Sequence, residues 1–333
     1  SSTGVPIALL NTFASIWRLP GLPPTHHLVI PGQGWKGSQI GIWLLWKNLR
    51  LSKLRRAWSQ KARHLGCDRL SSLRQLARQN GLDLARETDF DQWPIPFTFK
   101  RFPFISLHAL EFEFRHEPLP GVHYVGPMVL KRRPTHHSSE ESQALLDRLR
   151  QRRTQSPGRY RMIYAGFGSG FTTDLALVRR LITAVASREN WDLLISLGQQ
   201  EKAELGDLPS NVHTFPWLPQ VSVLEQSDLV VSHGGINTID ESVLAGVPLL
   251  IYCGHETDMA GNAARVQHHS LGLVGSRSRD TSQTIAAYLE TLLSESRFRE
   301  SVQRMRACYL AYTEQQVAER VVGSLMAGQP ASR

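Results

Sequence analysis

Apolar runs alternate with helix-like segments from residue 161 onward, and this alternation restricts the fold more than any other feature of the chain. Buried parallel strands read as continuous apolar runs, whereas helices show apolar residues three and four apart. The alternation predicts an α/β fold, with a parallel sheet covered by helices on both faces. The predicted strands are 161–167, 191–197, 211–215, 228–232, 248–252 and 271–274; the predicted helices are 174–187, 236–244 and 262–269, with two more helices after them.

The first 125 residues show a different pattern. Strand-like runs occur only at 5–10 and 104–107, which is too few for a complete doubly wound domain. A loop rich in proline and glycine leads to Gly37, and a basic amphipathic region covers 38–80. We therefore predict a partial N-terminal domain at 1–126, a linker and domain entry at 127–159, a complete C-terminal domain at 160–313, and a C-terminal helix at 314–333 that packs back on the N-terminal domain.

Composition narrows the class of protein. The 333 residues are enough for two domains, and 41% hydrophobic with 20% charged residues is typical of a globular chain. The three cysteines are widely spaced and form no C-x-x-C pair, so we expect reduced thiols, no zinc site and a cytoplasmic protein. The longest strongly apolar run, 40–46, is far shorter than the roughly 20 residues that cross a bilayer.

The net charge of +9 comes from one segment, 36–86, which holds twelve Lys or Arg and two acids. Such an excess attracts nucleic acid, anionic membranes or anionic ligands. Residues 38–63 mix tryptophan, leucine and basic residues, which is compatible with peripheral membrane contact. The commoner alternative is a surface helix that packs its apolar side on the domain. No nucleic-acid motif accompanies the charge, so we expect no nucleic-acid partner. The adjacent histidines at 26–27 are expected at the surface.

The stretch SHGGINTIDESVLAGVP, 232–248, predicts a ligand site. Ser232 ends a predicted strand, and ligands of open α/β sheets bind at the carboxyl ends of strands, so His233 lies at that edge. Gly234 and Gly235 let backbone N–H groups approach a bulky ligand. The helix that follows offers unpaired N–H groups and a partial positive charge, which suits a phosphate.

Helical spacing puts Asn237, Thr238 and Glu241 on one side of that helix. Asn237 and Thr238 lie in the first turn and can bind phosphate oxygens. Glu241 would be repelled by phosphate, so a neutral group with paired donors, such as a ribose diol, is its expected partner. The alternative for Asn237 or Thr238 is ordinary helix capping.

Two other motifs are incomplete. HGG also occurs in lipases, but no serine here has glycine at both −2 and +2, so the nucleophile elbow is missing. GFGSG, 166–170, would need its third glycine at Phe171 to be a dinucleotide fingerprint. For this segment we therefore predict only a glycine–serine turn after a strand.

The segment 217–262, with W-x-P-Q, H-x-G-x-N-T-x-x-E and G-V-P in register, resembles the nucleotide-sugar signature of UDP-glycosyltransferases of the GT-B fold. The bacterial macrolide and sterol enzymes are the most similar. GFGS at 166–169 and VGP at 125–127 also match, and the resemblance extends from Gly4 to Val322. It implies two Rossmann-like domains, the N-terminal one incomplete and the C-terminal one complete.

The resemblance also implies roles for individual residues. The nucleotide-binding set is Trp217 stacked on the uracil, Leu218, Gln220 at the ribose, His233, Asn237, Thr238 and the Gly235 amide at the diphosphate, Glu241 at the ribose hydroxyls, and Ser169 near the phosphates. Asp258 and Met259 take the sugar-binding positions. Met259 replaces the family's glutamine and Cys253 its proline, which leaves the identity of the sugar open.

The implied activity is transfer of a hexose from a UDP- or dTDP-sugar to a hydroxyl of a small-molecule or lipid-like acceptor, with inversion and without a metal or other cofactor. In the family a histidine in the first part of the N-terminal domain is the general base. We therefore expect this chain to be an N-terminally truncated piece whose base lies upstream of residue 1. The alternative is a non-catalytic nucleotide-sugar-binding subunit whose partner supplies the base. The expected location is the cytoplasm, with possible peripheral contact at the inner membrane face.

Overall fold

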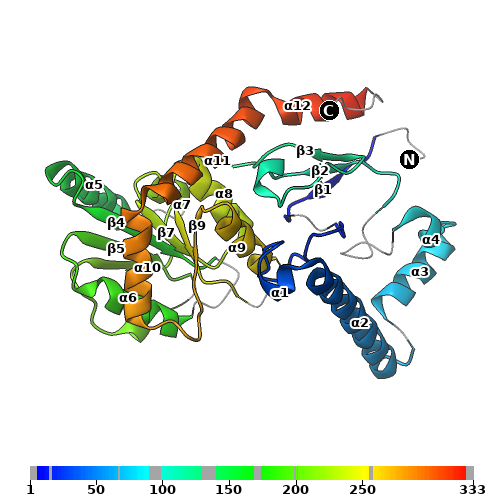
Figure 1. Cartoon of the computed structure of the whole chain (residues 1–333), viewed down its shortest axis with the longest axis horizontal. Coiled ribbons are helices and arrows are strands. Elements are labelled where there is room, and N and C mark those ends of the chain that lie inside the picture. The colour runs from blue at the N-terminus through cyan, green and yellow to red at the C-terminus, as the bar shows by residue number, and fades with distance from the viewer. Residues whose placement is uncertain are drawn as a thin grey trace. The chain divides into compact units, whose positions relative to one another are not determined.

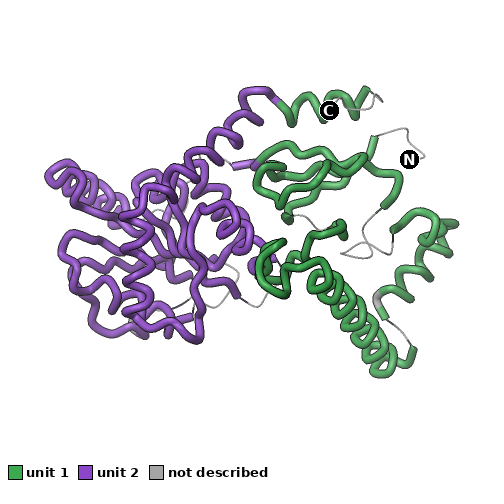
Figure 2. Tube along the Cα trace, viewed as in Figure 1, with its two compact units in different colours: residues 1–126, 317–333 green, residues 127–316 purple. Residues whose placement is uncertain are grey.

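The computed structural model describes residues 6–14, 17–66, 68–89, 99–129, 140–168, 174–198, 200, 202–254 and 258–327. The chain forms two compact units, shown in Figure 2. Unit 1 contains 1–126 together with 317–333, and unit 2 contains 127–316.

The sheet of unit 2 has six parallel strands in the order β6-β5-β4-β7-β8-β9. The first strand in sequence, β4, lies in the middle between β5 and β7, so the chain builds one half of the sheet and then returns to build the other. Ligands of such sheets bind at the carboxyl ends of the strands where the order reverses, here between β4 and β7. The strands are β4 (Arg161–Gly166), β5 (Trp191–Ser196), β6 (Val212–Phe215), β7 (Leu229–Ser232), β8 (Leu249–Ile251) and β9 (Gly272–Val274).

Helices cover both faces of this sheet, as the apolar runs predicted. Helices α6 (Leu175–Ala186) and α10 (Ser282–Ser294) lie side by side in Figure 1 and pack Leu181 and Leu289 on the strand residues Ile163 and Leu193. Strand residues whose side chains point to the other face of the sheet, such as Tyr164, are also buried, so that face is covered as well. The other elements are α5 (Glu140–Gln155), the 3₁₀-helix η2 (Lys202–Leu205), α7 (Gln220–Leu224), α8 (Ile236–Ala245), α9 (Met259–His268) and α11 (Ser296–Glu314).

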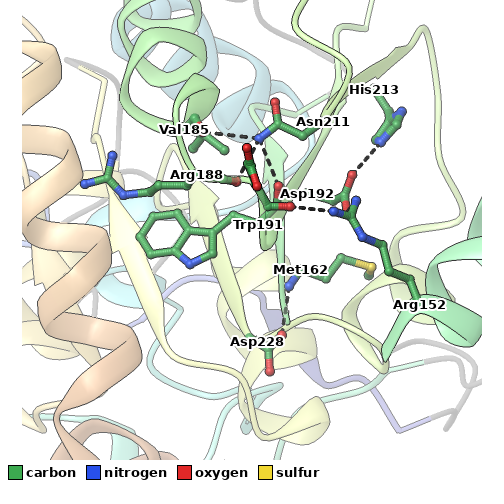
Figure 3. Close-up of polar contacts among 10 residues, drawn as sticks. Arg152, Met162, Val185, Arg188, Trp191, Asp192, Asn211, His213 and Asp228 are labelled. Carbon is green, nitrogen blue, oxygen red and sulfur yellow. Dashed lines mark hydrogen bonds and ion pairs between the residues drawn. The ribbon is translucent and has the colours of Figure 1, made fainter. Parts of the chain in front are cut away.

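Helix α5 is fixed to the amino ends of the strands by ion pairs of two arginines, and Figure 3 shows the pair that Arg152 makes. Arg152 donates from Nη1 to Asp192 at 2.6 Å, and Nε2 of His213 contacts the other Asp192 oxygen at 2.9 Å. The neighbouring Arg153 pairs with Asp228 at 2.5 Å, and the same carboxylate accepts a hydrogen bond from the Met162 amide. These contacts lie at the sheet edge opposite the carboxyl ends.

Unit 1 contains a three-stranded parallel sheet in the order β1 (Leu9–Asn11), β2 (Phe104–Ser106), β3 (Val122–Tyr124). The strand predicted at 5–10 starts pairing only at Leu9; Pro6 has no N–H to donate. Strand β3 was not predicted, because its three residues between Gly121 and Gly126 form no apolar run. Both strands lie beside β2, which the sequence did predict.

The basic region 38–80 forms two helices, α2 (Gln39–Arg63) and α3 (Arg69–Gln79). Ser38 caps α2, and the chain turns at Leu65 and Gly66, both with positive φ. Asp68 begins α3 by accepting a hydrogen bond from the Ser71 amide at 2.6 Å. The remaining short helices are α1 (Gly34–Gly37), α4 (Leu84–Glu87) and the 3₁₀-helix η1 (Leu110–Phe112).

Two other sequence expectations differ from the structure. Three helices, not two, follow β9 in the described residues, because Gln316 with φ 50° separates α11 from α12 (Val317–Met326). Helix α12 packs Val321 against Ile105 and Val125 of unit 1. His26 is half-buried rather than at the surface and contacts the His27 ring at 4.2 Å between centroids. Burial, followed by the charge of His27, lowers the pKa of His26 to about 4.

Candidate functional site

The carboxyl ends of β4 and β7 meet at the reversal of strand order, where Gly166 pairs with Ser232. His233 follows immediately and lies between two glycine loops. A Cβ at Gly168 would lie 3.0 Å from Cε1 of His233, and a Cβ at Gly235 would lie 2.7 Å from its Nε2. Gly168 and Gly234 also have φ near +85° and +89°, which L side chains rarely adopt. The glycines of both loops therefore provide the space that the imidazole occupies.

The environment of His233 favours a neutral imidazole. Burial is the largest cause that lowers its pKa, and the positive charge of Arg277 acts in the same direction. A backbone hydrogen bond with Gly166 and the charge of Asp258 oppose this shift without reversing it. At neutral pH the ring is therefore uncharged and carries a single N–H donor.

Arg277 was not singled out from the sequence. Its Nε donates to the carbonyl of Tyr252 at the end of β8, at 2.9 Å, and Arg180 donates to the Arg277 carbonyl at 2.6 Å. These contacts hold a cation at the same edge as His233. The sequence does place Arg277 just after the last predicted strand. Residues that follow parallel strands gather at one edge of the sheet, so this position could have marked Arg277 as a candidate site residue.

Helix α8 begins at this edge with Gly235 as its N-cap, and no side chain caps it. Neither Asn237 nor Thr238 is the capping residue, so the capping alternative is wrong for both. Asn237 is exposed and Thr238 is buried, and both lie in the first turn. The first N–H groups of a helix have no partner within the helix and attract negative charge.

One turn further along α8, Glu241 meets Gln220 from the start of α7. Gln220 Nε2 donates to Glu241 Oε2 at 2.6 Å, and it lies 3.3 Å from the Thr238 hydroxyl. The Tyr164 hydroxyl, from inside β4, donates to Gln220 Oε1 at 3.2 Å. Burial and the Glu241 charge raise the pKa of Tyr164, which stays protonated. The sequence did not identify Tyr164 because it reads as part of an apolar strand.

Asp258 and Met259 begin α9 next to the Gly234 loop. The fully buried Asn262 donates from Nδ2 to Asp258 at 2.9 Å and to the Gly234 carbonyl at 3.1 Å, so it joins the two segments. Met259 is buried against Gly234. Its side chain fills the core, which was not evident from its place in the motif.

The remaining predicted residues are less closely connected. Trp217 is 36% exposed, which leaves part of its ring available for stacking. Leu218 is buried, so its side chain packs in the core and only its backbone can face a ligand. Ser169 lies outside the described residues. Among the described residues, no cluster of three or more His, Cys, Asp or Glu is arranged to hold a metal ion.

The arrangement has two chemically different halves. One half suits a diphosphate. It contains the N–H groups that begin at Gly235, the Thr238 hydroxyl, the neutral imidazole of His233 and the cation of Arg277. The Gln220–Glu241 pair provides an acceptor carboxylate one helical turn away, which suits hydroxyl groups.

Comparison with known proteins finds a family model and several relatives that are similar to part of this chain. Residues 179–325 match the model described as "Erythromycin biosynthesis protein CIII-like, C-terminal domain". The oleandomycin glycosyltransferase of Streptomyces antibioticus is 30% identical over 176 residues, which are 52% of this chain and 40% of that protein. The zeaxanthin glucosyltransferase of Pantoea ananas is 26% identical over 230 residues, 68% of this chain and 50% of that protein. The chain thus spans half or less of the length of these relatives.

Solved structures show the same fold at low sequence identity. The calicheamicin glycosyltransferase CalG4 has a TM-score of 0.57 at 23% identity and covers 77% of this chain and 60% of its own. The glycotransferase of kitacinnamycin has a TM-score of 0.56 at 22% identity, covering 67% and 55%. These structures show that the chain has the GT-B fold, and the family model and the relatives show that its C-terminal part is similar to glycosyltransferases.

Proposed function

We propose that unit 2 binds a nucleoside-diphosphate sugar, with UDP or dTDP as the nucleotide. In this proposal the protein transfers the sugar, a hexose, to a hydroxyl of a small-molecule or lipid-like acceptor. The configuration at C1 inverts, and no metal takes part. The observation that carries the proposal is the contact between Gln220 and Glu241, one turn beyond the uncapped N-terminus of α8. In this arrangement a group that suits phosphate lies next to a group that suits a diol, just as the phosphates lie next to the ribose in a nucleotide.

Each part of the donor has a partner in this proposal. The diphosphate lies at the start of α8, on the Gly235 and Thr238 backbone and the His233 ring. The ribose hydroxyls donate to Glu241, which Gln220 holds in place, and Tyr164 in turn donates to Gln220. The base stacks on the exposed part of Trp217. The sugar hydroxyls meet Asp258, which Asn262 orients.

The residues at α8 also have a role in the chemistry. When the bond between C1 of the sugar and the phosphate oxygen breaks, negative charge grows on the departing phosphate. Preorganised N–H donors and the fixed charge of Arg277 stabilise it there, and the loss of one such donor costs about 3 kcal/mol in comparable sites. The acceptor hydroxyl needs a general base as well, and the residues above serve only the donor.

A thermal-shift titration with UDP, dTDP, GDP, ADP and NAD tests donor binding. A ligand at one hundred times its Kd stabilises the fold by about 2.7 kcal/mol, which is detectable. We expect UDP or dTDP to stabilise the parent chain and to have little effect on Trp217→Ala and His233→Ala. A folded chain that binds none of these nucleotides, or variants that respond like the parent, would contradict the proposal.

The part of the relatives that this chain matches supports one alternative. The matched segments cover only 40% and 50% of the two relatives, so a nucleotide-sugar-binding subunit that depends on a partner for the base is the second candidate. Release of UDP in the presence of hydroxylated acceptors distinguishes the two. Donor binding without turnover supports the subunit, and turnover by this chain alone supports the complete enzyme.

A further inference from the structure

Helix α2 carries two apolar faces. Ile42 and Trp46 are buried on one side, and Trp46 donates from its indole N–H to the Leu22 carbonyl at 2.7 Å. This face packs on unit 1, as the sequence alternative predicted. The opposite side carries a second set of large apolar side chains, exposed from 39% at Leu44 to 75% at Trp58. We call this set the outer stripe: Ile40, Trp43, Leu44, Leu51, Leu54 and Trp58.

The outer stripe is continuous along the helix. Its members recur at steps of three, four and seven residues, so they share one side of the 3.6-residue repeat. The helix has 25 residues and is about 37 Å long at 1.5 Å per residue. Contiguous exposed apolar surface on this scale marks a site of interaction.

The charge around the outer stripe has a single sign. Helix α2 contains seven Lys or Arg and no Asp or Glu. Arg55 and Lys61 flank the stripe by their helical positions, and Lys47 lies within it with its ammonium 5.1 Å from the centre of the Trp43 ring. The partner must therefore offer an apolar region bordered by negative charge.

Charge decides between the possible partners. Ile40, Leu44, Lys47, Leu51, Leu54 and Trp58 follow the spacing of a coiled-coil seam. In a dimer of two copies, however, two acid-free helices would bring like charges together. Tryptophan rings at both ends of an apolar face, with cations at its borders, are typical of a helix lying in a membrane interface. No helix of the described chain is long and apolar enough to cross a bilayer.

We propose that α2 lies flat in the interfacial layer of a membrane that contains anionic phospholipid. The outer stripe enters the boundary between headgroups and acyl chains, and the flanking cations contact lipid phosphates. This proposal is independent of the donor site in unit 2. It concerns the same region, 38–63, for which the sequence alone left a packed surface helix and membrane contact as alternatives.

Flotation of the full chain with lipid vesicles tests the proposal. We expect the chain to float with vesicles of phosphatidylglycerol and phosphatidylcholine, and to stay behind with phosphatidylcholine alone. Binding should weaken strongly near ~1 M salt, where the Debye length is about 3 Å. Tryptophan fluorescence should shift to shorter wavelength on binding as Trp43 and Trp58 leave water.

Two variants separate the apolar from the electrostatic contribution. Leu51→Ser/Leu54→Ser/Trp58→Ser should lower the partition coefficient at least about tenfold, because apolar burial is lost. Lys47→Gln/Arg55→Gln/Lys61→Gln should lower it on the order of a hundredfold, because each cation near an anionic surface contributes separately. Val322→Ser/Met326→Ser, on exposed positions of α12, is the matched control and should bind like the parent. Circular dichroism of each variant checks that the fold is retained.

Three results would overturn the proposal. The first is absence of flotation with anionic vesicles at low salt. The second is unchanged flotation of the folded Leu51→Ser/Leu54→Ser/Trp58→Ser variant. The third is a dimer in solution that the same variant converts to a monomer, since the outer stripe would then be an interface between two copies.

Discussion

The side-chain amide of Gln220 donates a hydrogen bond of 2.6 Å to the carboxylate of Glu241, which joins the start of α7 to the second turn of α8. The two residues are 21 positions apart, and both are among those the family resemblance marks for the ribose. The contact fixes the orientation of one carboxylate oxygen. A carboxylate has more than one acceptor site, so Glu241 can accept hydrogen bonds from a ligand in addition to this one.

Glu241→Gln should weaken UDP binding by roughly ten- to a hundredfold, because a hydrogen bond to a charged group contributes about 1.5–3 kcal/mol. The parent should also prefer UDP to 2′-deoxy-UDP, and the variant should lose that preference. Calorimetric titration with both nucleotides measures the effect. Glu290→Gln, at an exposed carboxylate that pairs with Arg188, is the matched control and should bind like the parent. If Glu241→Gln still preferred UDP to 2′-deoxy-UDP as the parent does, the ribose would not be the ligand of Glu241.

The lowered pKa of His233 predicts its titration. Its NMR midpoint in the free chain should lie below the ordinary 6.5, because burial and Arg277 disfavour the imidazolium. The unfolded chain therefore binds this proton more readily, so the contribution of His233 to stability is present above pH 6.5 and falls as the pH falls through the lowered value. Arg277→Gln should raise the midpoint, and bound UDP should raise it further.

Arg279→Gln is the control for this titration, because Arg279 is an exposed cation two residues away whose Nε donates to Ser276. It should leave the His233 midpoint near that of the parent. A midpoint that is the same in the parent and in Arg277→Gln would show that this guanidinium does not act on His233.

Asn262→Ala should destabilise the chain by about 2 kcal/mol, because the Asp258 carboxylate and the Gly234 carbonyl lose a buried donor. It should also weaken UDP binding, since the Gly234 loop positions His233. Urea unfolding and calorimetry give the two values. Asn190→Ala, which removes an exposed hydrogen bond to the Arg159 carbonyl, should change neither by much. Equal effects of the two substitutions would contradict a positioning role for Asn262.

Asp192→Ala should separate stability from binding. Asp192 is buried between Arg152 and His213 at the amino ends of the strands, and its loss should cost about 2 kcal/mol, less than for a fully enclosed pair because Arg152 reaches solvent. UDP affinity measured well below the unfolding temperature should not change. Asp147→Ala, in an exposed pair with Arg150, should cost about 0.5 kcal/mol or less. A large loss of UDP affinity in folded Asp192→Ala would show that the two sheet edges are coupled.

The sequence predicted the sheet of unit 2 because each strand there is a buried apolar run, and it predicted the side shared by Thr238 and Glu241 because helical spacing is a local property. It did not predict the break at Gln316, where no glycine or proline marks a left-handed residue. Strand β3 is too short for a pattern to emerge.

Tyr164 and Arg277 were missed for another reason. Their roles depend on neighbours far along the chain, Gln220 for the tyrosine and Tyr252 for the arginine. Local patterns identify which residues face an edge of the sheet, but not which of them meet there. The contact between Gln220 and Glu241 also joins residues far apart in the sequence, so it could be recognised only in the structure.

Calorimetric titration of the parent chain with UDP and with uridine, both in the presence of EDTA, tests the central claim most directly. If a metal-free diphosphate site lies at the start of α8, UDP binds with a 1:1 stoichiometry, uridine binds far more weakly, and His233→Ala loses most of the difference. Equal binding of UDP and uridine, or no binding of UDP to the folded chain, would contradict the account.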